Sequence, residues 1–311
     1  MTKELYLIHG RDFKPSETEL KKNWVEALKY GIKRDFPEQA DELLNGLKIK
    51  FIYYGEESNA FLRGIGRRYD SDHDQKDRKN CIKLLKQYTK KDFNKKKYKK
   101  VPNSSPFKEG LADGLAGLLN ILGVADNLIT KVAPDMKEYW NHDSAFGSNV
   151  RHSLSKHLSK SFKNDHDVLL ISHSLGTLIA YDVLWKFSHY SEYEHIRDKK
   201  LSCLLTLGSP LGDETVKDNL KGAKANGLRK YPTCIKKWIN VAAEDDYISH
   251  DQAIRNDFED MISSGLVNSI VDHRVYNLAE RHGSSNPHHG GGYLIHPSVS
   301  KAVVNWLKQN T

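Results

Sequence analysis

The chain has 311 residues, of which 38% are hydrophobic and 28% are charged, and its formal net charge is +8. These values are typical of a soluble globular protein with a polar surface. The first residues run directly into an expected core strand, and no segment is apolar for long enough to span a bilayer, so we expect neither an export signal nor a membrane anchor. The three cysteines lie far apart and form no CxxC pair, which favours reduced thiols in a cytoplasmic protein.

An alternation of strand and helix is expected from the start of the chain. Residues 4–8 and 47–54 are predicted strands because they are short apolar runs. The helix between them is predicted by a capping box at Ser16 and Glu19. Its apolar residues recur every four positions, as on a helix that packs on a sheet: Leu20, Trp24, Leu28 and Ile32.

This alternation stops between residues 55 and 139, where we expect a largely helical insertion. Its first part, the lysine-rich segment 83–100, begins at Lys83, ends at Lys100 and contains nine lysines and one aspartate, a net charge of +8. The second part, residues 111–129, has leucines at helical spacing and is interpreted either as a lid over a site or as a helix packed on the core. The whole chain, residues 1–311, is then a single domain with one insertion.

Regular alternation resumes after residue 139. The predicted elements are a helix around 150–162, strands at 168–171, 201–207, 235–242 and 274–278, a helix that contains Ile254 and Met261, and a last helix that opens at Pro297. Together with the first two strands, these elements predict the α/β class, a doubly wound and mostly parallel sheet of about six strands.

Residues 167–184, DVLLISHSLGTLIAYDVL, form the central element of this prediction. An apolar strand turns through a short polar segment into an apolar helix, and Ser174 lies at the corner. A serine at such a corner projects its hydroxyl from the carboxyl edge of the sheet, and the helix that follows directs backbone N–H groups at a developing oxyanion. Small residues are needed two positions before and after it. Gly176 meets this need, and Ser172 stands where glycine is usual.

A nucleophilic serine needs a base, and the base needs a carboxylate that holds it in the correct tautomer. The strand that ends near residue 242 is followed by Asp245 and Asp246. The last predicted strand leads into a group of histidines: His282, His288, His289 and His296. Because functional groups collect at the carboxyl ends of parallel strands, we expect an acid and a histidine near Ser174.

Five segments in this order resemble the α/β-hydrolases of the lipase and esterase type: LYLIHG, SHSLG, TLGSPLG, WINVAAEDDYIS and NPHHGGGYLIHP. The resemblance touches most of the core strands and leaves the insertion unmatched, and it implies a compact version without the two antiparallel strands that begin larger members. By position it implies that Ser174 is the nucleophile, Asp246 the acid and His288 the base. The backbone N–H groups of Arg11 and Leu175 would form the oxyanion hole, and no metal or organic cofactor is implied.

Two of these assignments choose between neighbours. The DYI sequence that starts at Asp246 is similar to the acid segment of the family, and Asp245 is the alternative. The PHHGGGYL sequence that contains His288 is similar to the family's Pro-His-x-x-x-Gly-Tyr-Leu ending, and His289 is the alternative. In the alternative interpretation, the aspartates only cap the helix that follows and the histidines hold a metal ion. The spacings of these histidines match no compact metal-ligand motif.

The lysine-rich segment 83–100 has a structural and a functional interpretation. Most charge runs are solvated faces or loops. The functional interpretation is peripheral docking to an acidic membrane, where each lysine near the surface contributes about 1 kcal/mol. Its interleaved aromatic residues, Tyr88, Phe93 and Tyr98, have the pattern of base stacking, but no nucleic-acid-binding motif is recognisable and nucleic acid is not the expected partner.

The expected function is hydrolysis of a carboxylic ester of a small molecule, lipid or phospholipid through an acyl-enzyme. Thioester hydrolysis, acyl transfer and peptide hydrolysis stay open, because fold and triad do not define the leaving group. The alternative is a catalytically idle protein on a hydrolase fold that binds anionic membrane surfaces through the lysine-rich segment. The expected location is cytoplasmic, free or peripheral at a membrane.

Overall fold

The structure is a computed structural model that describes residues 1–90, 93, 95–101, 133–249 and 253–309. Its strands are β1 (Lys3–Ile8), β2 (Lys48–Ile52), β3 (Asp167–His173), β4 (Cys203–Leu207), β5 (Lys237–Ala243), β6 (Ser269–Val275), β7 (Glu280–Arg281) and β8 (Ser284–Ser285). Its helices are α1 (Glu17–Asp35), α2 (Ala40–Leu44), α3 (Gly55–Gly64), α4 (Ser71–Tyr88), α5 (Lys95–Tyr98), α8 (Pro134–Trp140), α9 (Phe146–Lys163), α10 (Leu175–His189), α11 (Glu214–Asn219), α12 (Glu259–Ser263), α13 (Gly290–Leu294) and α14 (Pro297–Lys308).

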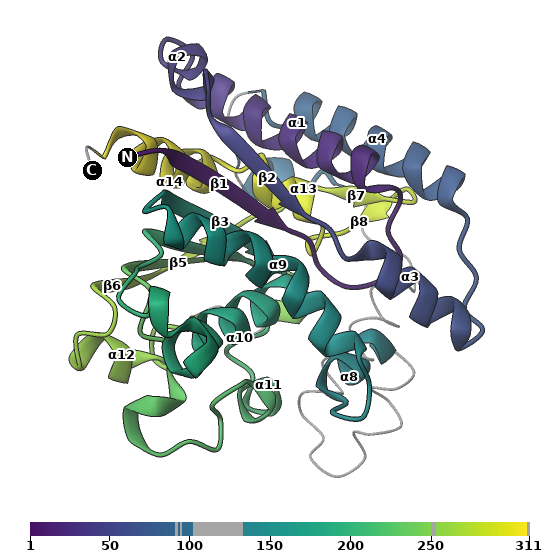
Figure 1. The fold of residues 1–311 in the computed structure, drawn as a ribbon. Helices are drawn as coiled ribbons and strands as arrows, with labels where there is room; N and C mark the ends of the chain where they lie inside the picture. The colour runs from purple at the N-terminus through teal and green to yellow at the C-terminus, as the bar shows by residue number, and fades with distance from the viewer. Residues whose placement is uncertain (91–92, 94, 102–132, 250–252, 310–311) are drawn as a thin grey trace.

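Six strands form one sheet in the order β2-β1-β3-β4-β5-β6, and each neighbouring pair is parallel. Helices α1, α13 and α14 cover one face of this sheet, and α9 and α10 cover the other (Figure 1). The two apolar cores lie between these layers and the sheet. The predicted α/β class with about six strands is therefore confirmed. Strands β7 and β8 form a small separate antiparallel ladder.

Strand β3 lies in the middle of the sheet, between β1 and β4, and all of its residues are buried. A strand with helices on both faces must be apolar on both sides, which explains the continuous run from Val168 to Ile171. The charged residue at its start, Asp167, is buried too. It accepts hydrogen bonds from the Lys3 ammonium at 2.5 Å and from Trp306 Nε1 at 2.8 Å, so its charge is paired.

Helix α1 forms as its sequence predicts. Ser16 caps it, because its Oγ accepts a hydrogen bond from the Glu19 N–H at 3.4 Å. The four residues of the predicted face are all buried against the sheet: Leu20, Trp24, Leu28 and Ile32. Burying side chains of this size stabilises the fold by about 1.5 to 3 kcal/mol each, so this face fixes the helix on the sheet.

The predicted position of the last strand was wrong. The prediction placed it at residues 274–278, whereas β6 spans Ser269–Val275. Because β6 is the edge strand, its residues are largely polar and partly exposed, so no apolar run marks it. The predicted helix around Ile254 and Met261 is also shorter than expected, since α12 includes Met261 but not Ile254.

The insertion predicted at residues 55–139 is helical where it is described, in α3, α4, α5 and α8. The leucine-rich part at 111–129, interpreted as a lid or a packed helix, lies outside the described residues. Helix α4 packs against α1 and α13 and so covers the core rather than standing apart from it.

The lysine-rich segment 83–100 is attached to the core through its aromatic residues. Tyr88 donates a hydrogen bond from its hydroxyl to Glu280 at 2.5 Å, and Tyr98 donates one to Asp245. The Phe93 ring packs edge-on against His296, with ring centroids 4.5 Å apart. These rings anchor the segment, so its docking to a membrane depends on the lysines and stays a prediction. Within the described ranges, no helix has both the length and the apolar composition needed to cross a bilayer.

Candidate active site

Ser174 lies between β3 and α10, at a backbone conformation that side chains rarely adopt. Its φ is 53° and its ψ is −127°. A non-glycine residue in such a region costs about 1 to 3 kcal/mol, and it persists only where its surroundings hold it. Thr177 supplies part of that hold, because its N–H and its Oγ1 both donate to the Ser174 carbonyl, at 2.8 and 2.7 Å. The strain is therefore localised at the residue predicted to be the nucleophile.

The tight corner depends on two glycines. A Cβ on Gly176 would lie 2.5 Å from the His9 carbonyl oxygen, and one on Gly10 would lie 2.5 Å from the Ser174 Cβ. The third small residue, Ser172, occupies its place within β3 without exposure, but its buried hydroxyl has no hydrogen-bond partner among the described residues. The turn thus tolerates serine at the position where the sequence departs from the usual glycine.

Three residues from separate segments meet at this corner: Ser174 after β3, Asp246 after β5 and His288 between β8 and α13. His288 Nε2 lies 2.9 Å from Ser174 Oγ. On the other side of the ring, His288 Nδ1 lies 2.9 and 3.0 Å from the two carboxylate oxygens of Asp246. A carboxylate can only accept, so Nδ1 carries the proton and Nε2 is left as an acceptor for the serine proton. The structure thus brings together Ser174, Asp246 and His288, the three residues that the sequence selected.

Asp246 is held by a residue that the sequence analysis did not assign. The Tyr293 hydroxyl donates to Asp246 Oδ2 at 2.5 Å and accepts the Ala243 N–H at 2.9 Å. Burial alone would raise the pKa of Asp246, but the charge of His288 and the hydrogen bonds from His288 and Tyr293 lower it. Gly208, with φ of 51°, leaves room for this group, since a Cβ there would lie 2.8 Å from Asp246 Oδ2.

The neighbours that were the alternatives have other partners. Asp245 accepts the Tyr98 hydroxyl on the outer side of the loop. His289 Nδ1 lies 3.5 Å from the Cys81 sulfur, and burial lowers the pKa of His289 well below its usual range. Neither of them contacts Ser174 among the hydrogen bonds of the described residues, so the geometry favours Asp246 and His288.

His173, the residue before Ser174, holds the backbone of His288 in place. Its Nε2 lies 2.7 Å from the His288 carbonyl oxygen, which can only accept, so the ring donates there. Burial, followed by the charge of His288, lowers the pKa of His173 to about 3. His173 therefore stays neutral at ordinary pH and fixes the backbone position of the His288 residue.

The residues of the predicted oxyanion hole flank Ser174. Leu175 is the first residue of α10, where backbone N–H groups have no partner within the helix. Arg11 lies in the loop after β1, next to Gly10, whose backbone contacts Ser174. The fully buried Asp135 of α8 holds this loop: its carboxylate accepts Arg11 Nε at 3.0 Å and the Asp12 N–H at 2.6 Å. Asp12 itself has a φ of 76°.

Lys14 also holds the loop after β1. Its ammonium donates to the carbonyl oxygens of Arg11, Asp12 and Phe13, and its backbone exchanges two hydrogen bonds with the Asn59 amide, at 2.9 and 2.8 Å. Burial, with the charge of Arg78, lowers the pKa of Lys14 to about 7. The loop that carries the Arg11 N–H is therefore positioned by polar contacts from both ends of the insertion.

A pocket of about 550 Å³ opens beside Ser174. Its apolar wall includes Leu20 and Trp24 from α1, and the Phe13 ring that stacks on Tyr69 with centroids 4.7 Å apart. This volume is in the range of small-molecule sites in proteins. The pocket is thus large enough for a substrate whose reacting carbonyl reaches the serine.

The histidines that suggested a metal site have separate partners. His282 stacks on His73 with ring centroids 5.2 Å apart, while His296 caps α14 and contacts Phe93. Among the described residues there is no group of three or more His, Cys, Asp or Glu side chains that could hold a metal ion.

Three residues of the site, Tyr293, Asp135 and Lys14, were missed in the sequence analysis. Tyr293 belonged to a quoted motif, and the tyrosine in that motif was the available signal. Asp135 carried no signal, because its contact with Arg11 spans 124 positions. Lys14 lies only three positions from Arg11, but a single lysine in a loop does not indicate which groups it bonds.

Comparison with known proteins gives no match: no family model, no curated protein and no solved structure is significantly similar to this chain.

Proposed function

We propose that the protein is a serine hydrolase that cleaves carboxylic esters. One observation carries the proposal: a strained serine at a strand-to-helix corner lies 2.9 Å from a histidine whose other nitrogen faces a buried carboxylate. This arrangement has the geometry of an activated nucleophile, its base and the group that orients the base. The resemblance of five sequence segments to the α/β-hydrolases supports it independently.

In the first half of the reaction, His288 Nε2 accepts the proton of Ser174 Oγ as the oxygen attacks the ester carbonyl carbon. The carbonyl oxygen becomes an oxyanion, which the N–H groups of Leu175 and Arg11 stabilise. His288 then gives its proton to the leaving alcohol, and the C–O bond of the ester breaks. The acyl group is left on Ser174.

In the second half, water replaces the alcohol. His288 accepts a proton from the water as its oxygen attacks the acyl carbonyl, and the bond to Ser174 Oγ breaks. The proton returns to the serine and the free acid leaves. Asp246 keeps the positively charged imidazole stable in both halves, which is why its own position, set by Tyr293, matters to the rate.

A panel of nitrophenyl esters of increasing chain length tests the proposal. We expect release of nitrophenol by the wild type, and a loss of at least about 10³-fold in kcat for Ser174→Ala. Ser153→Ala on α9, a serine outside the pocket, is the matched control and should retain wild-type turnover. Turnover that Ser174→Ala leaves intact would overturn the proposal, and no turnover by the wild type on any ester would favour the catalytically idle binding protein.

A further inference from the structure

The pocket beside Ser174 is surrounded by cationic side chains from four separate segments. Those that line it among the described residues are Arg11, Lys14, Arg67, Arg68, Arg78 and Arg281. In the described part of the chain, three carboxylates line the same pocket: Asp12, Asp70 and Asp74. The segments are the loop after β1, the turn between α3 and α4, the body of α4 and the ladder of β7 and β8.

Ion pairing at this pocket wall leaves an excess of about one positive charge, because Asp77 and Asp135 also pair with the arginines that line it. Asp74 is shared by two guanidinium groups, because Arg78 Nε donates to one of its oxygens at 2.7 Å and Arg281 Nη2 to the other at 2.6 Å. Arg281 also pairs with Asp77. Arg11 pairs with Asp135, as described above. These pairs are held in place by burial, with side chains of Arg281 and Asp74 only 9% and 12% exposed.

Arg68 stands apart from this network. It is exposed at the pocket wall, in the turn between α3 and α4, and has no carboxylate partner among the described residues. Its guanidinium is therefore not held by an ion pair among the described residues, although Asp70 lies two positions away, and its side chain is long enough to reach a bound ligand. Guanidinium groups form paired, charge-assisted hydrogen bonds with carboxylates and phosphates.

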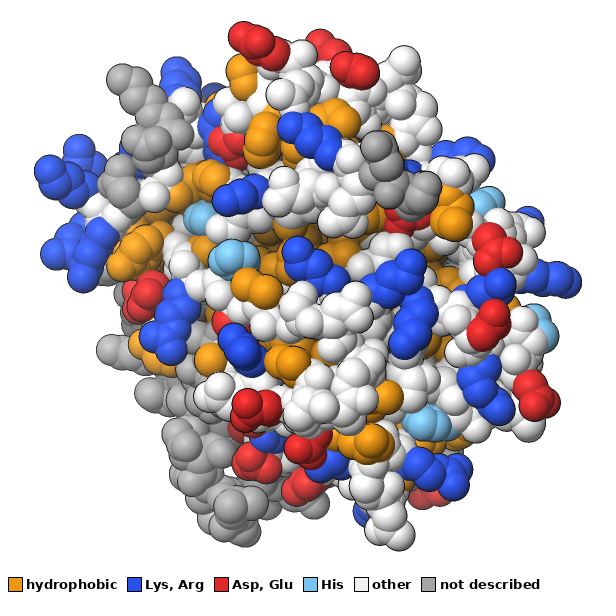
Figure 2. Space-filling view, turned by 90° about the vertical axis from the view of Figure 1, so that its left-hand side faces the viewer, with side chains coloured by type: hydrophobic (Ala, Val, Ile, Leu, Met, Phe, Trp, Pro, Cys, Tyr) orange, Lys and Arg blue, Asp and Glu red, His pale blue; other side chains and the backbone are white. Residues whose placement is uncertain are grey.

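Burial is the main cause of the lowered pKa of two groups at the pocket, and nearby charges modify it, with Asp12, Asp135 and Asp74 raising the pKa of Lys14. After burial, the charge of Arg78 contributes to the lowered pKa of Lys14, and the charges of Arg281 and Arg78 contribute to the lowered pKa of His289. The opposite end of the molecule, where the strands start, differs in character. Figure 2 views that end, and basic and acidic side chains are both spread over it. The pocket is thus a place where cations converge, rather than a sample of an evenly basic surface.

We propose that this pocket selects esters that carry a second, anionic group, a carboxylate or a phosphate, in one of their two halves. This inference rests on the proposed function and names its substrate class. The ester carbonyl lies at Ser174, the carbon skeleton lies against Leu20, Trp24 and Phe13, and the anionic group lies toward Arg68 and the arginines of the inner wall. A pocket wall with this many charged side chains disfavours a long neutral acyl chain, because the charged side chains would lose their water without gaining a partner.

Two ester pairs test the proposal, one for each half of the substrate. The acyl pair is mono-4-nitrophenyl succinate against 4-nitrophenyl butyrate, and the alcohol pair is 4-acetoxybenzoate against 4-acetoxytoluene. Each kcat/KM is divided by the rate of hydroxide-catalysed hydrolysis of the same ester. We expect a preference of about tenfold or more for the anionic member of at least one pair. This preference should shrink as added salt shortens the Debye length from about 30 to about 3 Å. No preference in either pair would overturn the proposal.

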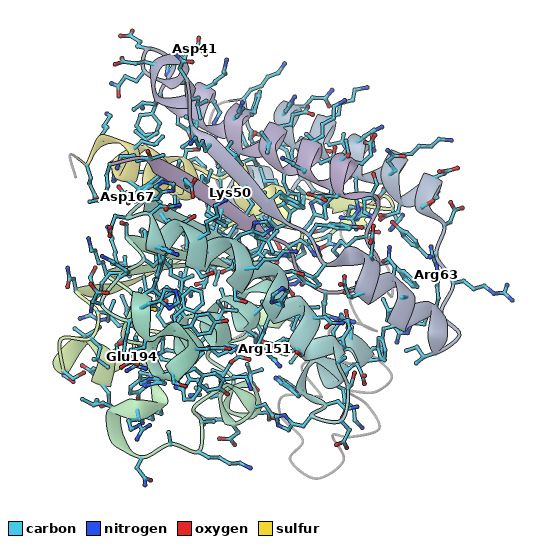
Figure 3. The ribbon with its side chains drawn as sticks, in the orientation of Figure 1. Asp41, Lys50, Arg63, Arg151, Asp167 and Glu194 are labelled. Atoms are coloured by element: carbon cyan, nitrogen blue, oxygen red, sulfur yellow. The ribbon has the colours of Figure 1, made fainter. Side chains whose placement is uncertain are left out.

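Three variants locate the preference in the pocket wall. Arg68→Gln should lower the ratio of anionic to neutral kcat/KM by about two- to fivefold. Asp70→Asn should raise it by about twofold, because it removes a negative charge while asparagine still caps α4. The control is Arg63→Gln, an exposed residue of α3 labelled in Figure 3 that does not line the pocket, and its ratio should equal that of the wild type. Equal ratios in all three variants would contradict the assignment.

A binding measurement separates this inference from the proposed function. The Ser174→Ala protein cannot acylate, so 4-acetoxybenzoate and 4-acetoxytoluene can be titrated into it by calorimetry without turnover. Tighter binding of the carboxylate, weakened by the additional change Arg68→Gln, supports the inference even if no ester is hydrolysed. Equal binding of the two, in a protein whose wild type does hydrolyse esters, overturns the inference and leaves the proposed function standing.

Discussion

The two regions that build the site differ in how their side chains are held. At the corner after β3, Ser174, Asp246 and His288 are each fixed by further contacts, and Asp246 is only 2% exposed. In the pocket wall between α3 and α4, Arg68 and Asp70 are exposed side chains of a turn. In the proposed reaction these three residues therefore define the chemistry, and the wall can change its charge without disturbing them. Reaction type should thus resist substitution in the wall, while selectivity should not.

Replacing Asp246, the proposed acid, gives the largest expected effect. Asp246→Asn should lower kcat by about 10³- to 10⁴-fold, because an amide can stabilise the wrong tautomer of His288. Asp245→Asn, one residue earlier, is the matched control. Its amide oxygen can still accept the Tyr98 hydroxyl, and the change should alter kcat by less than about threefold. Steady-state kinetics on one nitrophenyl ester measures both, and equal losses would show that the carboxylate position does not matter to the reaction.

Removing the hydroxyl of Tyr293 tests the support behind the acid. Tyr293→Phe removes a buried hydroxyl that accepts the Ala243 N–H and donates to Asp246 Oδ2. We expect the free energy of unfolding to fall by about 1 to 3 kcal/mol and kcat to fall by about tenfold at unchanged KM. Urea denaturation and kinetics at the same pH are the measurements. A rise in KM at constant kcat would contradict a role in positioning Asp246.

The pH dependence of stability should be visible at His296, a histidine that does not line the pocket. Burial, followed by the charge of Arg34, lowers the pKa of His296 to about 3. Between the usual histidine pKa of about 6.5 and this value, the unfolded chain binds a proton that the folded protein does not. Protonation of this one histidine in the unfolded chain should therefore lower the free energy of unfolding by about 1.4 kcal/mol for each pH unit below 6.5.

His296→Asn isolates that contribution, because asparagine can still cap α14. The variant should be less stable than the wild type near pH 7, and the difference should shrink as pH falls toward 4.5. Urea denaturation across this range gives the two curves. Parallel curves would show that His296 does not carry the effect.

The smallest effect is expected at Ser172, which stands where glycine is usual before such a serine. Ser172→Ala removes a buried hydroxyl that has no partner among the described residues. We expect the free energy of unfolding to stay the same or rise by up to about 1 kcal/mol, with kcat within about twofold of the wild type. Thermal and urea unfolding measure this change. A clear loss of stability would mean that the hydroxyl makes a contact in solution, for example with water.

The sheet and the selected residues could be predicted because parallel strands with both faces covered are read directly as apolar runs. The choice between Asp245 and Asp246 could not be derived from such patterns. It depends on the turn after β5, where Asp246 Oδ1 accepts the Ile248 N–H and the side chain points inward. The edge strand β6 escaped prediction because it is polar and partly exposed. Apolar runs thus carry no information on a side chain that a turn directs inward, or on a strand that is partly exposed.

The residues that hold the Arg11 loop after β1 could not be predicted either, and the reason is different. Asp135 lies near the far end of the insertion, 124 positions from Arg11, and a lone aspartate in the first turn of a helix has many ordinary roles. The charge of the pocket wall was equally hidden, since Arg68 and Arg281 are far apart in the sequence and neither lies in the lysine-rich segment 83–100. The conspicuous charge run drew attention, whereas the cations beside Ser174 are single residues from separate segments.

The most direct test of the central claim is labelling of the native protein with a fluorophosphonate probe, followed by peptide mass spectrometry. The account predicts stoichiometric labelling at Ser174, slowed by at least about 10²-fold in His288→Ala, because the serine is then without its base. No label on the wild type, or label on another residue that survives in Ser174→Ala, would contradict it.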